Sequence, residues 1–325
     1  MNNATLKKIS EVLGLSISTI SRALKDHPDI AEKTKERVRE VANVLDYEPN
    51  VNAIQLRTNR TNIFGLIVPT VSNFFYDSFI ASVEEECRRN NYSLMILQSS
   101  DKPEIELDNL KFCRQSRISG LFISITSKTE DLKPFSKFKE TGTPVIFFDK
   151  VPEAPNHNKV CMGDTMSAVI AANTIIDKRK KKVLALFGNK NLSITKKRKD
   201  AFITTIGEQI NLLNYHADSS FEAEKITDKV LKEKPDTIFC MSDEILIGAM
   251  KAIHKANLIV PTDISVIAVS NGFIPKLYYP EITYVETSGY KLGKLAFSSM
   301  MACVSDNKIV QELTLESILE EGGSI

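Results

Sequence analysis

Seven short, nearly continuous apolar runs follow Asn62, and they constrain the fold of this chain more than any other feature. They read IFGLIVP, SLMILQ, GLFISI, PVIFFD, VLALFG, TIFCMSD and SVIAVS, and helical segments separate them. Short apolar runs that alternate with helices are typical of parallel strands buried on both faces. Seven such strands are more than one small sheet needs. We therefore predict an α/β body made of two doubly wound parallel-sheet lobes.

The first 47 residues show a different pattern, with helical periodicity and no strand-like run. Thr5 and Ser16 are suited to cap two short helices, and Gly14 breaks the chain between them. We expect the first helix to bury Leu6, Ile9, Val12 and Leu13. A third helix follows Pro28, which completes the helix-turn-helix arrangement of an all-α DNA-binding headpiece. The alternative is a three-helix bundle whose second helix is merely rich in serine.

Charge does not identify the headpiece. The whole chain has a net charge of +1, and residues 1–60 hold ten Lys and Arg against eight Asp and Glu. A nucleic-acid-binding surface must therefore be local and must depend on particular side chains. In the second helix the short hydroxyl side chains suit phosphates and base edges, and Arg22 can make a bidentate contact with guanine.

Several other function classes find little support in the sequence. The five cysteines are unpaired in spacing, which predicts structural thiols in a reducing cytoplasm. The first residues lack the apolar segment of a signal peptide, and no apolar run approaches the ~18 residues of a membrane span. There is no phosphate-binding GxxxxGK[ST], no GxGxxG and no metal-spaced His/Cys cluster. We expect a soluble cytoplasmic protein, not an enzyme, with no catalytic residue, metal, cofactor or membrane partner.

Two segments carry a specific resemblance. TLKKISEVLGLSISTISRALKDHPDI, followed by YEPNVNAIQLR, resembles the headpiece of the lactose repressor family (LacI/GalR) in motif and in spacing. The similarity continues through the body and covers nearly the whole chain. It implies that Ile17, Ser18 and Arg22 read bases. It also implies a set of phosphate contacts, namely Thr5, Ser16, Thr19, Ser21, Thr34, Tyr47 and Asn50.

The resemblance extends to a hinge helix between Asn50 and Arg57. In the family this helix forms when two protomers meet on DNA, and a leucine then wedges between base pairs from the minor groove. Leu56 occupies that position here, with Ala53 one turn earlier. The alternative is that Leu56 is a linker residue that packs on the body. The implied partner is double-stranded, pseudo-palindromic operator DNA, bound by a homodimer.

Polar side chains follow the apolar runs at the points where a ligand site is expected in an α/β fold. Amides, carboxylates and one Arg from several strand ends suit a polyhydroxylated small molecule. The candidate effector-binding residues are Asn73, Phe74, Phe75, Asp149, Arg198, Asp243 and Asn271. The aromatic residues could instead belong to the core, and the two aspartates could be helix caps. The resemblance favours Asp149 and Arg198 most and Asn271 least.

The chain departs from the family pattern around this site. Lys197 replaces a Glu, Ala201 and Ala268 replace glycines, and Lys150 replaces an Arg. The basic run DKRKKK (177–182) is interpreted as a solvated helix end rather than a second nucleic-acid site. These departures leave the identity of the effector open.

The predicted organisation has four parts. A helix-turn-helix domain covers residues 1–47, and the hinge helix and linker cover 48–61. The N-terminal lobe combines 62–160 with 288–310, and the C-terminal lobe combines 161–287 with 311–325. We expect a transcriptional repressor whose operator affinity is modulated by a small effector, a carbohydrate, bound between the lobes. The alternative is a solute-binding receptor without DNA function, against which the headpiece argues. The chain end lacks a leucine-heptad tail, so we expect a dimer rather than a tetramer.

Overall fold

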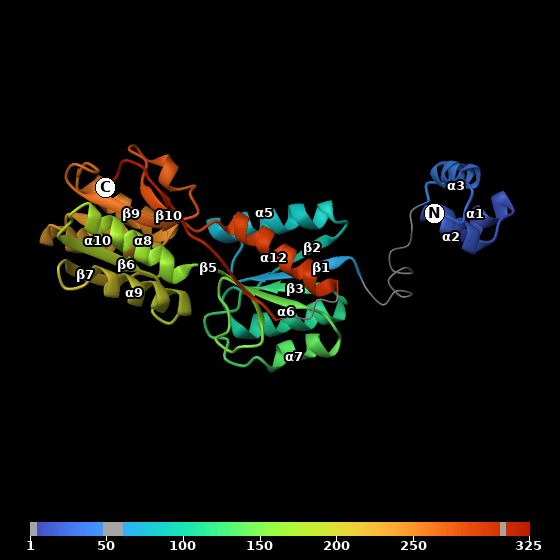
Figure 1. Cartoon of the computed structure of the whole chain (residues 1–325), viewed down its shortest axis with the longest axis horizontal. Coiled ribbons are helices and arrows are strands. Elements are labelled where there is room, and N and C mark those ends of the chain that lie inside the picture. Colours follow the sequence, from blue (N-terminus) through green and yellow to red (C-terminus); the bar gives the residue numbers. More distant parts are fainter. Residues whose placement is uncertain (1–4, 48–60, 306–309) are drawn as a thin grey trace. The chain divides into compact units, whose positions relative to one another are not determined.

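A computed structural model describes residues 5–47, 61–305 and 310–325. The chain divides into two compact units, one up to Arg60 and one from Thr61 onward, and Figure 1 shows the elements of each. The predicted hinge-helix residues Asn50, Ala53 and Leu56 lie outside the described residues.

The first unit consists of three helices, as predicted. They are α1 (Leu6–Leu13), α2 (Ile17–Leu24) and α3 (Glu32–Val44). Thr5 and Ser16 cap α1 and α2 through their side chains, and Gly14 ends α1 in the left-handed conformation with φ 66°. Each helix contributes to one small core, whose fully buried members are Ile9, Ile20, Ala23, Val38 and Ala42.

The predicted burial of Val12 is wrong, because its exposed fraction is 58%. Leu6 and Leu13 pack against the core on one side of the fully buried Ile9. At 3.6 residues per turn, Val12 lies on the other side of Ile9, about 100° from Leu13. An eight-residue helix in so small a bundle buries a narrow face, and Val12 falls outside it.

The second unit holds two six-stranded sheets, each covered by helices (Figure 1). The first sheet is parallel throughout and has the order β11-β5-β4-β3-β1-β2. Its strands are β1 (Ile63–Val68), β2 (Ser93–Gln98), β3 (Gly120–Ile123), β4 (Val145–Phe148), β5 (Asn158–Met162) and β11 (Glu312–Leu315). One face packs on α5 (Phe74–Arg89) and α12 (Gly289–Val304). The other packs on α6 (Pro103–Gln115) and α7 (Lys133–Glu140).

The second sheet has the order β12-β10-β9-β8-β6-β7, and only β12 runs antiparallel. Its strands are β6 (Lys182–Phe187), β7 (Asn211–His216), β8 (Thr237–Cys240), β9 (Ser265–Ser270), β10 (Thr283–Glu286) and β12 (Leu319–Glu320). Its helices are α8 (Asp164–Asp177), α9 (Ser193–Ile206), α10 (Ser220–Val230) and α11 (Asp243–Lys255), with short 3-10 turns η1 (Leu231–Glu233) and η2 (Pro275–Leu277). The fold class is therefore the predicted one.

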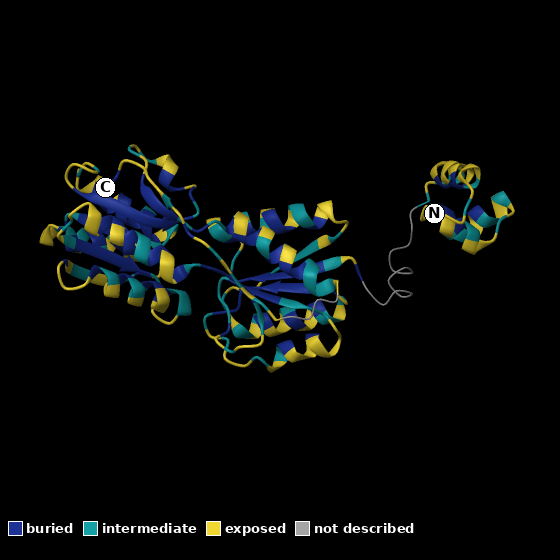
Figure 2. Ribbon diagram, in the orientation of Figure 1, coloured by how far each residue is buried: buried dark blue, intermediate teal, exposed yellow. Residues whose placement is uncertain are grey.

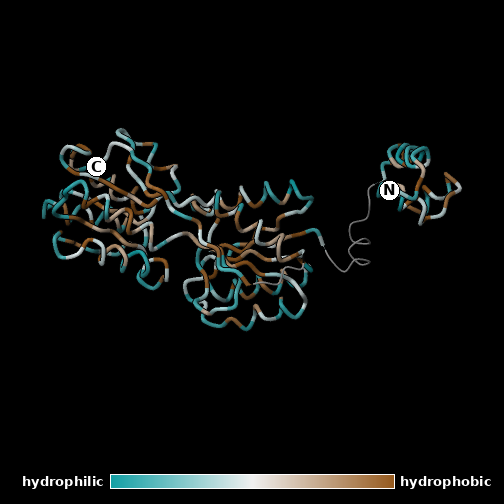
Figure 3. Tube along the Cα trace, in the orientation of Figure 1, coloured by the Kyte–Doolittle hydropathy of each residue, from teal (hydrophilic) through white to brown (hydrophobic). Residues whose placement is uncertain are grey.

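All seven predicted apolar runs form strands, and each sheet has its most buried strands in the centre (Figure 2). Brown, apolar trace runs through the middle of both sheets in Figure 3, while the covering helices alternate in hydropathy. The sequence analysis missed β5, β7, β10, β11 and β12. All five are edge strands or neighbour one, and β7 and β11 mix exposed and half-buried residues. Such strands lack the continuous apolar signal of a central strand.

One predicted boundary requires correction. The assignment of 311–325 to the C-terminal lobe fails for residues 312–315, because β11 pairs with β5 in the first sheet, Glu312 opposite Lys159 and Leu315 opposite Met162. Likewise, the last two residues of β5 lie in the first sheet rather than the second. The chain passes between the sheets after β5, β10 and β11, since successive strands there belong to different sheets.

Helices α5 and α12 approach each other unusually closely. A Cβ atom at Gly289 would lie 2.3 Å from the carbonyl oxygen of Phe75, and one at Gly293 would lie 2.9 Å from the carbonyl oxygen of Phe79. Only glycine allows backbones to come this near without displacement. The two helices therefore pack as one block on the first sheet.

No helix in the described part of the chain is long and apolar enough to cross a membrane.

Candidate functional site

The first turn of α2 is fixed by a cluster of hydroxyl groups. Ser16 Oγ accepts a hydrogen bond from the backbone N–H of Thr19 at 3.1 Å, and it lies 2.8 Å from the hydroxyls of both Ser18 and Thr19. Ile17 is 47% exposed although it is a large apolar residue. The exposed side chains at this helix start are those predicted to meet DNA, and the cap holds the backbone that carries them.

Arg22 lies one turn further along α2 and is exposed. Its Nη2 atom is 3.5 Å from Oδ2 of Asp29, and the two side chains are 54% and 57% exposed. Exposed pairs of this kind contribute ~0–1 kcal/mol. The guanidinium can therefore leave Asp29 for a base edge at small cost.

A four-charge network fixes α3 against the end of α2. Lys35 lies 3.0 Å from Asp26 and 3.3 Å from Glu32, and Arg39 lies 2.8 Å from the same Asp26. The ammonium of Lys35 is the main cause that lowers the pKa of Asp26, first by hydrogen bonding and then by charge. Asp26 itself adopts φ 57°, so the turn after α2 and the start of α3 are joined at one point.

The predicted phosphate contacts that the structure describes lie at two kinds of position. Thr5 and Ser16 are exposed helix caps, so their backbone neighbours also present N–H groups. The others are half-buried and lie on α2, on the first turn of α3 and after α3, namely Thr19, Ser21, Thr34 and Tyr47. Their contacts with DNA, and those predicted for base edges, stay predictions.

In the first lobe, Asp149 lies directly after β4 and adopts φ 55°. Aspartate tolerates this left-handed conformation better than most residues. Its Oδ2 accepts hydrogen bonds from the Tyr76 hydroxyl at 2.5 Å and from Ser124 at 3.4 Å. Burial first, and then the Asp149 charge, raises the pKa of Tyr76 well above its usual range. Tyr76 therefore stays a hydrogen-bond donor that holds Asp149 in place.

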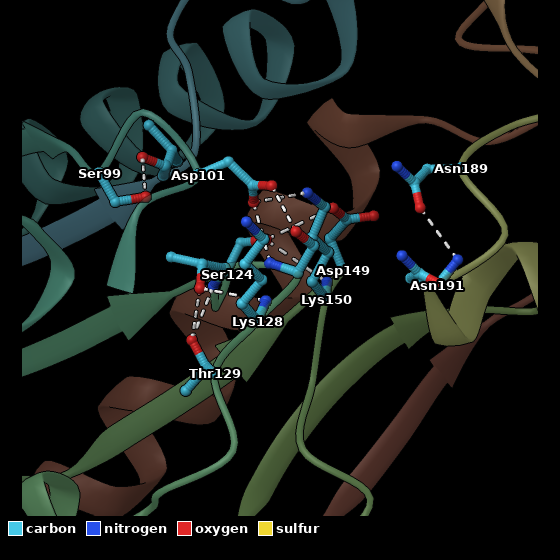
Figure 4. A network of polar contacts seen from close by, with 12 residues as sticks. Ser99, Asp101, Ser124, Lys128, Thr129, Asp149, Lys150, Asn189 and Asn191 are labelled. Atoms are coloured by element: carbon cyan, nitrogen blue, oxygen red, sulfur yellow. Dashed lines mark hydrogen bonds and ion pairs between the residues drawn. The ribbon is translucent and has the colours of Figure 1, made fainter. Parts of the chain in front are cut away.

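A wider polar network surrounds Asp149 at the carboxyl ends of β2, β3 and β4 (Figure 4). Asp101 accepts a hydrogen bond from Lys150 Nζ at 3.2 Å and binds the backbone N–H of Ser127 at 2.9 Å. The buried Glu106 of α6 accepts hydrogen bonds from Thr126 N and Thr129 Oγ1, both at 2.8 Å. The loop after β3 is thereby tied to two helices and two strands.

In the second lobe, Arg198 on α9 is 5% exposed and forms a buried ion pair. Its Nε and Nη2 atoms both donate to Oδ1 of Asp164, at 3.1 and 2.9 Å, and Nη1 donates to the carbonyl of Met241 at 3.2 Å. Burial raises the pKa of Asp164, while the charge of Arg198 opposes that change. Three of the five guanidinium N–H groups thus have acceptors among the described residues.

Asp243 and Asn271 hold a loop that reaches the other lobe. Asp243 accepts hydrogen bonds from the Ser270 hydroxyl and from the backbone N–H of Asn271. Asn271 Nδ2 then donates to the carbonyl oxygen of Phe74 at 2.8 Å, at the start of α5. The ring of Phe74 stacks on Phe273 at 5.5 Å. These contacts join the loop after β9 of the second sheet to the first helix of the first lobe.

Asn73 caps α5, because its Oδ1 accepts hydrogen bonds from the backbone N–H groups of Phe75 and Tyr76 at 2.9 and 3.3 Å. Phe75 is half-buried, with its ring edge-on to Tyr76 at 5.6 Å. Five of the candidate ligand residues therefore have structural contacts within the protein, namely Asn73, Asp149, Arg198, Asp243 and Asn271. Whether they also bind a ligand stays a prediction.

Three residues of this region are not among the candidates predicted from the sequence, although Tyr76 stands beside Phe74 and Phe75 in the same aromatic run. Tyr76 and Ser124 orient Asp149, and Asp164 pairs with Arg198. Ser124 follows the strand GLFI directly, so its position at a strand end was a usable signal. Asp164 gave no comparable signal, because the strand before it was itself missed. Among the described residues no group of His, Cys, Asp and Glu could hold a metal ion.

Two family models match the chain. One describes the bacterial regulatory proteins of the lacI family and covers residues 5–50. The other describes the periplasmic binding proteins and sugar binding domain of the LacI family and covers residues 61–316. The second match alone covers more than half of the chain.

Known relatives agree over nearly the full length. The HTH-type transcriptional repressor PurR of Vibrio vulnificus (strain CMCP6) is 26% identical and covers 94% of this chain and 93% of its own. The lac repressor dimer bound to operator and the anti-inducer ONPF is 19% identical, covers 99% of both chains and has a TM-score of 0.88. A periplasmic binding protein/LacI transcriptional regulator from Alkaliphilus metalliredigens, complexed with D-xylulofuranose, is 20% identical, covers 81% and 99%, and has a TM-score of 0.71. The solved structures confirm the fold, and the two family matches account for both units: the chain belongs to the lacI family of bacterial regulatory proteins and is a DNA-binding transcriptional regulator with a ligand-binding body.

Proposed function

We propose that this regulator is a repressor that binds a pseudo-palindromic operator as a homodimer and responds to a carbohydrate bound between its lobes. The observation that carries the DNA half of the proposal is the exposed, capped first turn of α2. A helix-turn-helix protein reads bases with the N-terminal residues of its second helix. Here those residues are exposed in a helix whose other face is buried at Ile20 and Ala23.

The exposed side chains of α2 each match a chemical group on DNA. Arg22 offers a bidentate donor pair for guanine, and Ser18 offers a small hydroxyl that either donates or accepts. Ile17 offers an apolar contact for a thymine methyl group. Because two protomers carry two such helices, a two-fold symmetric operator follows from a two-fold symmetric dimer.

The effector half rests on the polar groups at the strand ends of both lobes. Asp149 is held by Tyr76 and Ser124, and Arg198 is held by Asp164. Fixed carboxylates and guanidinium groups are the usual partners of sugar hydroxyls, and Phe75 and Phe74 supply apolar surface beside them. The D-xylulofuranose bound by one relative supports a carbohydrate of this size.

The Arg198–Asp164 pair also suggests how the effector signal leaves the site. Asp164 follows β5 of the first sheet and begins α8 of the second lobe, so it lies where the chain passes between lobes. The backbone N–H of the preceding Gly163 donates to the carbonyl of Leu315 at 2.9 Å. Leu315 ends β11, after which the chain also passes from the first lobe to the second. A ligand that draws Arg198 toward itself would change the lobe angle, and with it the DNA affinity of the dimer.

The DNA half is tested by selecting binding sites from a randomised oligonucleotide pool with purified full-length protein. The expected result is a two-fold symmetric consensus, bound with an affinity that falls steeply as salt rises. A variant lacking residues 1–61 should bind no DNA. If no consensus emerges, with or without candidate effectors, the proposal fails.

The effector half is tested by thermal-shift screening of the full-length protein against pentoses, hexoses and nucleobases. A binding pentose or hexose should raise the melting temperature and change the affinity for the selected operator. Asp149→Asn should abolish that shift, whereas Asp177→Asn, which changes an exposed aspartate at the end of α8, should not. A nucleobase that binds through Asp149 while all sugars fail would replace the carbohydrate in the proposal.

A further inference from the structure

A second pocket lies away from the residues described above, between α6 and α7 on the first lobe. Its volume is about 400 Å³, a size that suits a small metabolite. It is lined by Leu107, Asp108, Lys111, Arg114, Asp131, Lys133, Pro134 and Lys137. None of these residues belongs to the predicted effector site.

The pocket gathers four cationic side chains against two carboxylates. Lys111, Lys133 and Lys137 have no ion-pair partner among the described residues, and neither does Arg114. Asp131 is already used as a turn acceptor, because its Oδ1 accepts the backbone N–H of Lys133 at 2.9 Å. The lining therefore presents an excess of positive charge that the protein does not neutralise, which attracts anions.

A second basic cluster is only partly paired. The run DKRKKK at the end of α8 is richer in lysine, and two of its lysine side chains have internal partners. Lys180 Nζ donates to Ser265 at 2.6 Å, and Lys182 Nζ donates to the Glu233 carbonyl. The expectation of a freely solvated helix end was thus wrong for these two lysines. The cations between α6 and α7 differ in that they line one pocket together.

Arg114 is held in a fixed position in the pocket wall. Its guanidinium carbon lies 5.6 Å from the ring centre of Phe138, which is fully buried on α7. Its Nη1 atom is buried and has no hydrogen-bond partner in the described part of the chain. A guanidinium fixed over an aromatic ring loses less conformational freedom when it binds an anion.

The same pocket is connected to the polar network around Asp149. Glu106 directly precedes Leu107 in the pocket wall, and it binds Thr126 and Thr129 in the loop that leads to Asp131. Ser124, at the start of that loop, donates to Asp149. A ligand that moves α6 relative to α7 would therefore act on the loop that orients Asp149.

We propose that the α6–α7 pocket is a second ligand site of this regulator and that it takes a small phosphorylated metabolite. The phosphate binds Arg114 together with the lysines of the two helices, and the rest of the metabolite lies against Leu107 and Pro134. Occupation of the pocket tunes the response of the Asp149 network. The proposal does not depend on which effector binds between the lobes.

The test measures binding of inorganic phosphate, ribose 5-phosphate and ribose to the full-length protein by isothermal titration calorimetry. Ribose 5-phosphate should bind, phosphate should compete with it, and ribose should not compete. The double variant Lys111→Gln/Lys137→Gln should weaken ribose 5-phosphate at least tenfold. Lys139→Gln removes an exposed charge from α7, the helix that carries Lys137, but at a position outside the pocket. It should leave binding unchanged.

The variant Asp149→Asn distinguishes the pocket from the proposed effector site between the lobes. It should leave phosphate competition intact, because Asp149 does not line the pocket. Equal affinity in the double variant and in Lys139→Gln would overturn the proposal, and so would loss of binding in Asp149→Asn. Absence of binding by both phosphate compounds at millimolar concentration would also overturn it, as would binding of phosphorylated peptides but not of ribose 5-phosphate. Melting curves of each variant establish that the substitutions leave the fold intact.

Discussion

The headpiece and the body use their functional side chains in opposite ways. In the headpiece, Ile17, Ser18 and Arg22 are exposed, and the guanidinium of Arg22 forms an exposed ion pair with Asp29. In the body, Arg198 and Asp243 are engaged inside the protein by ion pairing and hydrogen bonding. A side chain of the first kind can change with little effect on folding. One of the second kind serves the fold, whether or not it also binds a ligand.

This difference explains why a motif identifies the headpiece so readily. The residues predicted to read bases are free of packing constraints, and the framework beneath them is a small core with defined caps. The body residues are constrained from inside, so their identities report on packing and hydrogen bonding as much as on the ligand. The following predictions test whether exposed headpiece residues affect DNA binding and engaged body residues affect stability.

The largest effect is expected for Arg198→Met. It leaves Asp164 as a buried carboxylate without its cation, and breaking a buried pair in this way costs about 3–5 kcal/mol of unfolding free energy. Urea denaturation of the full-length protein measures it. Lys197→Met, at the exposed neighbouring position, should change stability by less than ~0.5 kcal/mol. Equal losses in the two variants would mean that the pair is not structural.

Arg22→Ala should show the opposite behaviour. We expect a loss of about 1–3 kcal/mol in binding to the selected operator and a relaxed preference at one base per half-site. The unfolding free energy should change by less than ~0.5 kcal/mol, because Arg22 is exposed. Fluorescence anisotropy on operator and on single-base variants measures both affinity and preference.

Arg37→Ala is the matched control, since Arg37 is an exposed arginine of α3. It should leave the base preference unchanged even if it weakens binding to all sequences alike. An Arg22→Ala protein that discriminates among operators as well as the wild type would contradict the assignment.

Ser16→Ala tests an exposed headpiece position at which a substitution should nevertheless affect folding. Ser16 is exposed, yet it caps α2, so its loss should reduce helix stability by about 1 kcal/mol. Hydrogen exchange of the α2 amides in the full-length protein should accelerate accordingly. Ser18→Ala removes a hydroxyl from the same turn without removing the cap, and its exchange should remain close to that of the wild type.

The smallest effect is a pH dependence at Glu106. Burial raises the pKa of this carboxyl above its ordinary value of 4.5. The folded state therefore holds the proton more tightly, and this contribution to stability is complete below about pH 4.5 and is lost as the pH rises through the folded pKa. The stability difference between the wild type and Glu106→Gln should thus fall with rising pH. Glu104→Gln, which removes an exposed charge from the same helix, is the control. If its stability difference from the wild type fell with pH in the same way, the pH dependence would not belong to Glu106.

The sequence predicted the parts of the fold that have a continuous signal. All seven apolar runs are strands, and Thr5, Ser16 and Gly14 mark the ends of their helices as expected. Strands such as β7 and β11 were missed because these edge strands mix exposed and partly buried residues. The boundary near residue 311 was misplaced for the same reason.

The candidate ligand site was predictable only in part. Residues directly after strong strands, such as Asp149 and Asp243, were found because a polar residue at a strand end stands out. The partners that orient them were not, since Tyr76 lies on a helix and Asp164 follows a strand with a weak signal. Long-range pairs of this kind depend on the packing of distant segments, which local patterns do not contain.

The close approach of α5 and α12 has a consequence for how such a regulator can diversify. Gly289 and Gly293 let the two helix backbones touch, so neither helix can shift without the other. Phe74, at the start of α5, meets the loop after β9, and α12 follows β10 of the same sheet. The first lobe therefore meets that loop through a block of two helices whose spacing is set by backbone contact. Substitutions at the strand-end residues proposed to bind ligand can leave this helix pair unaltered, except at Asn271, whose side chain makes the hydrogen bond between the lobes.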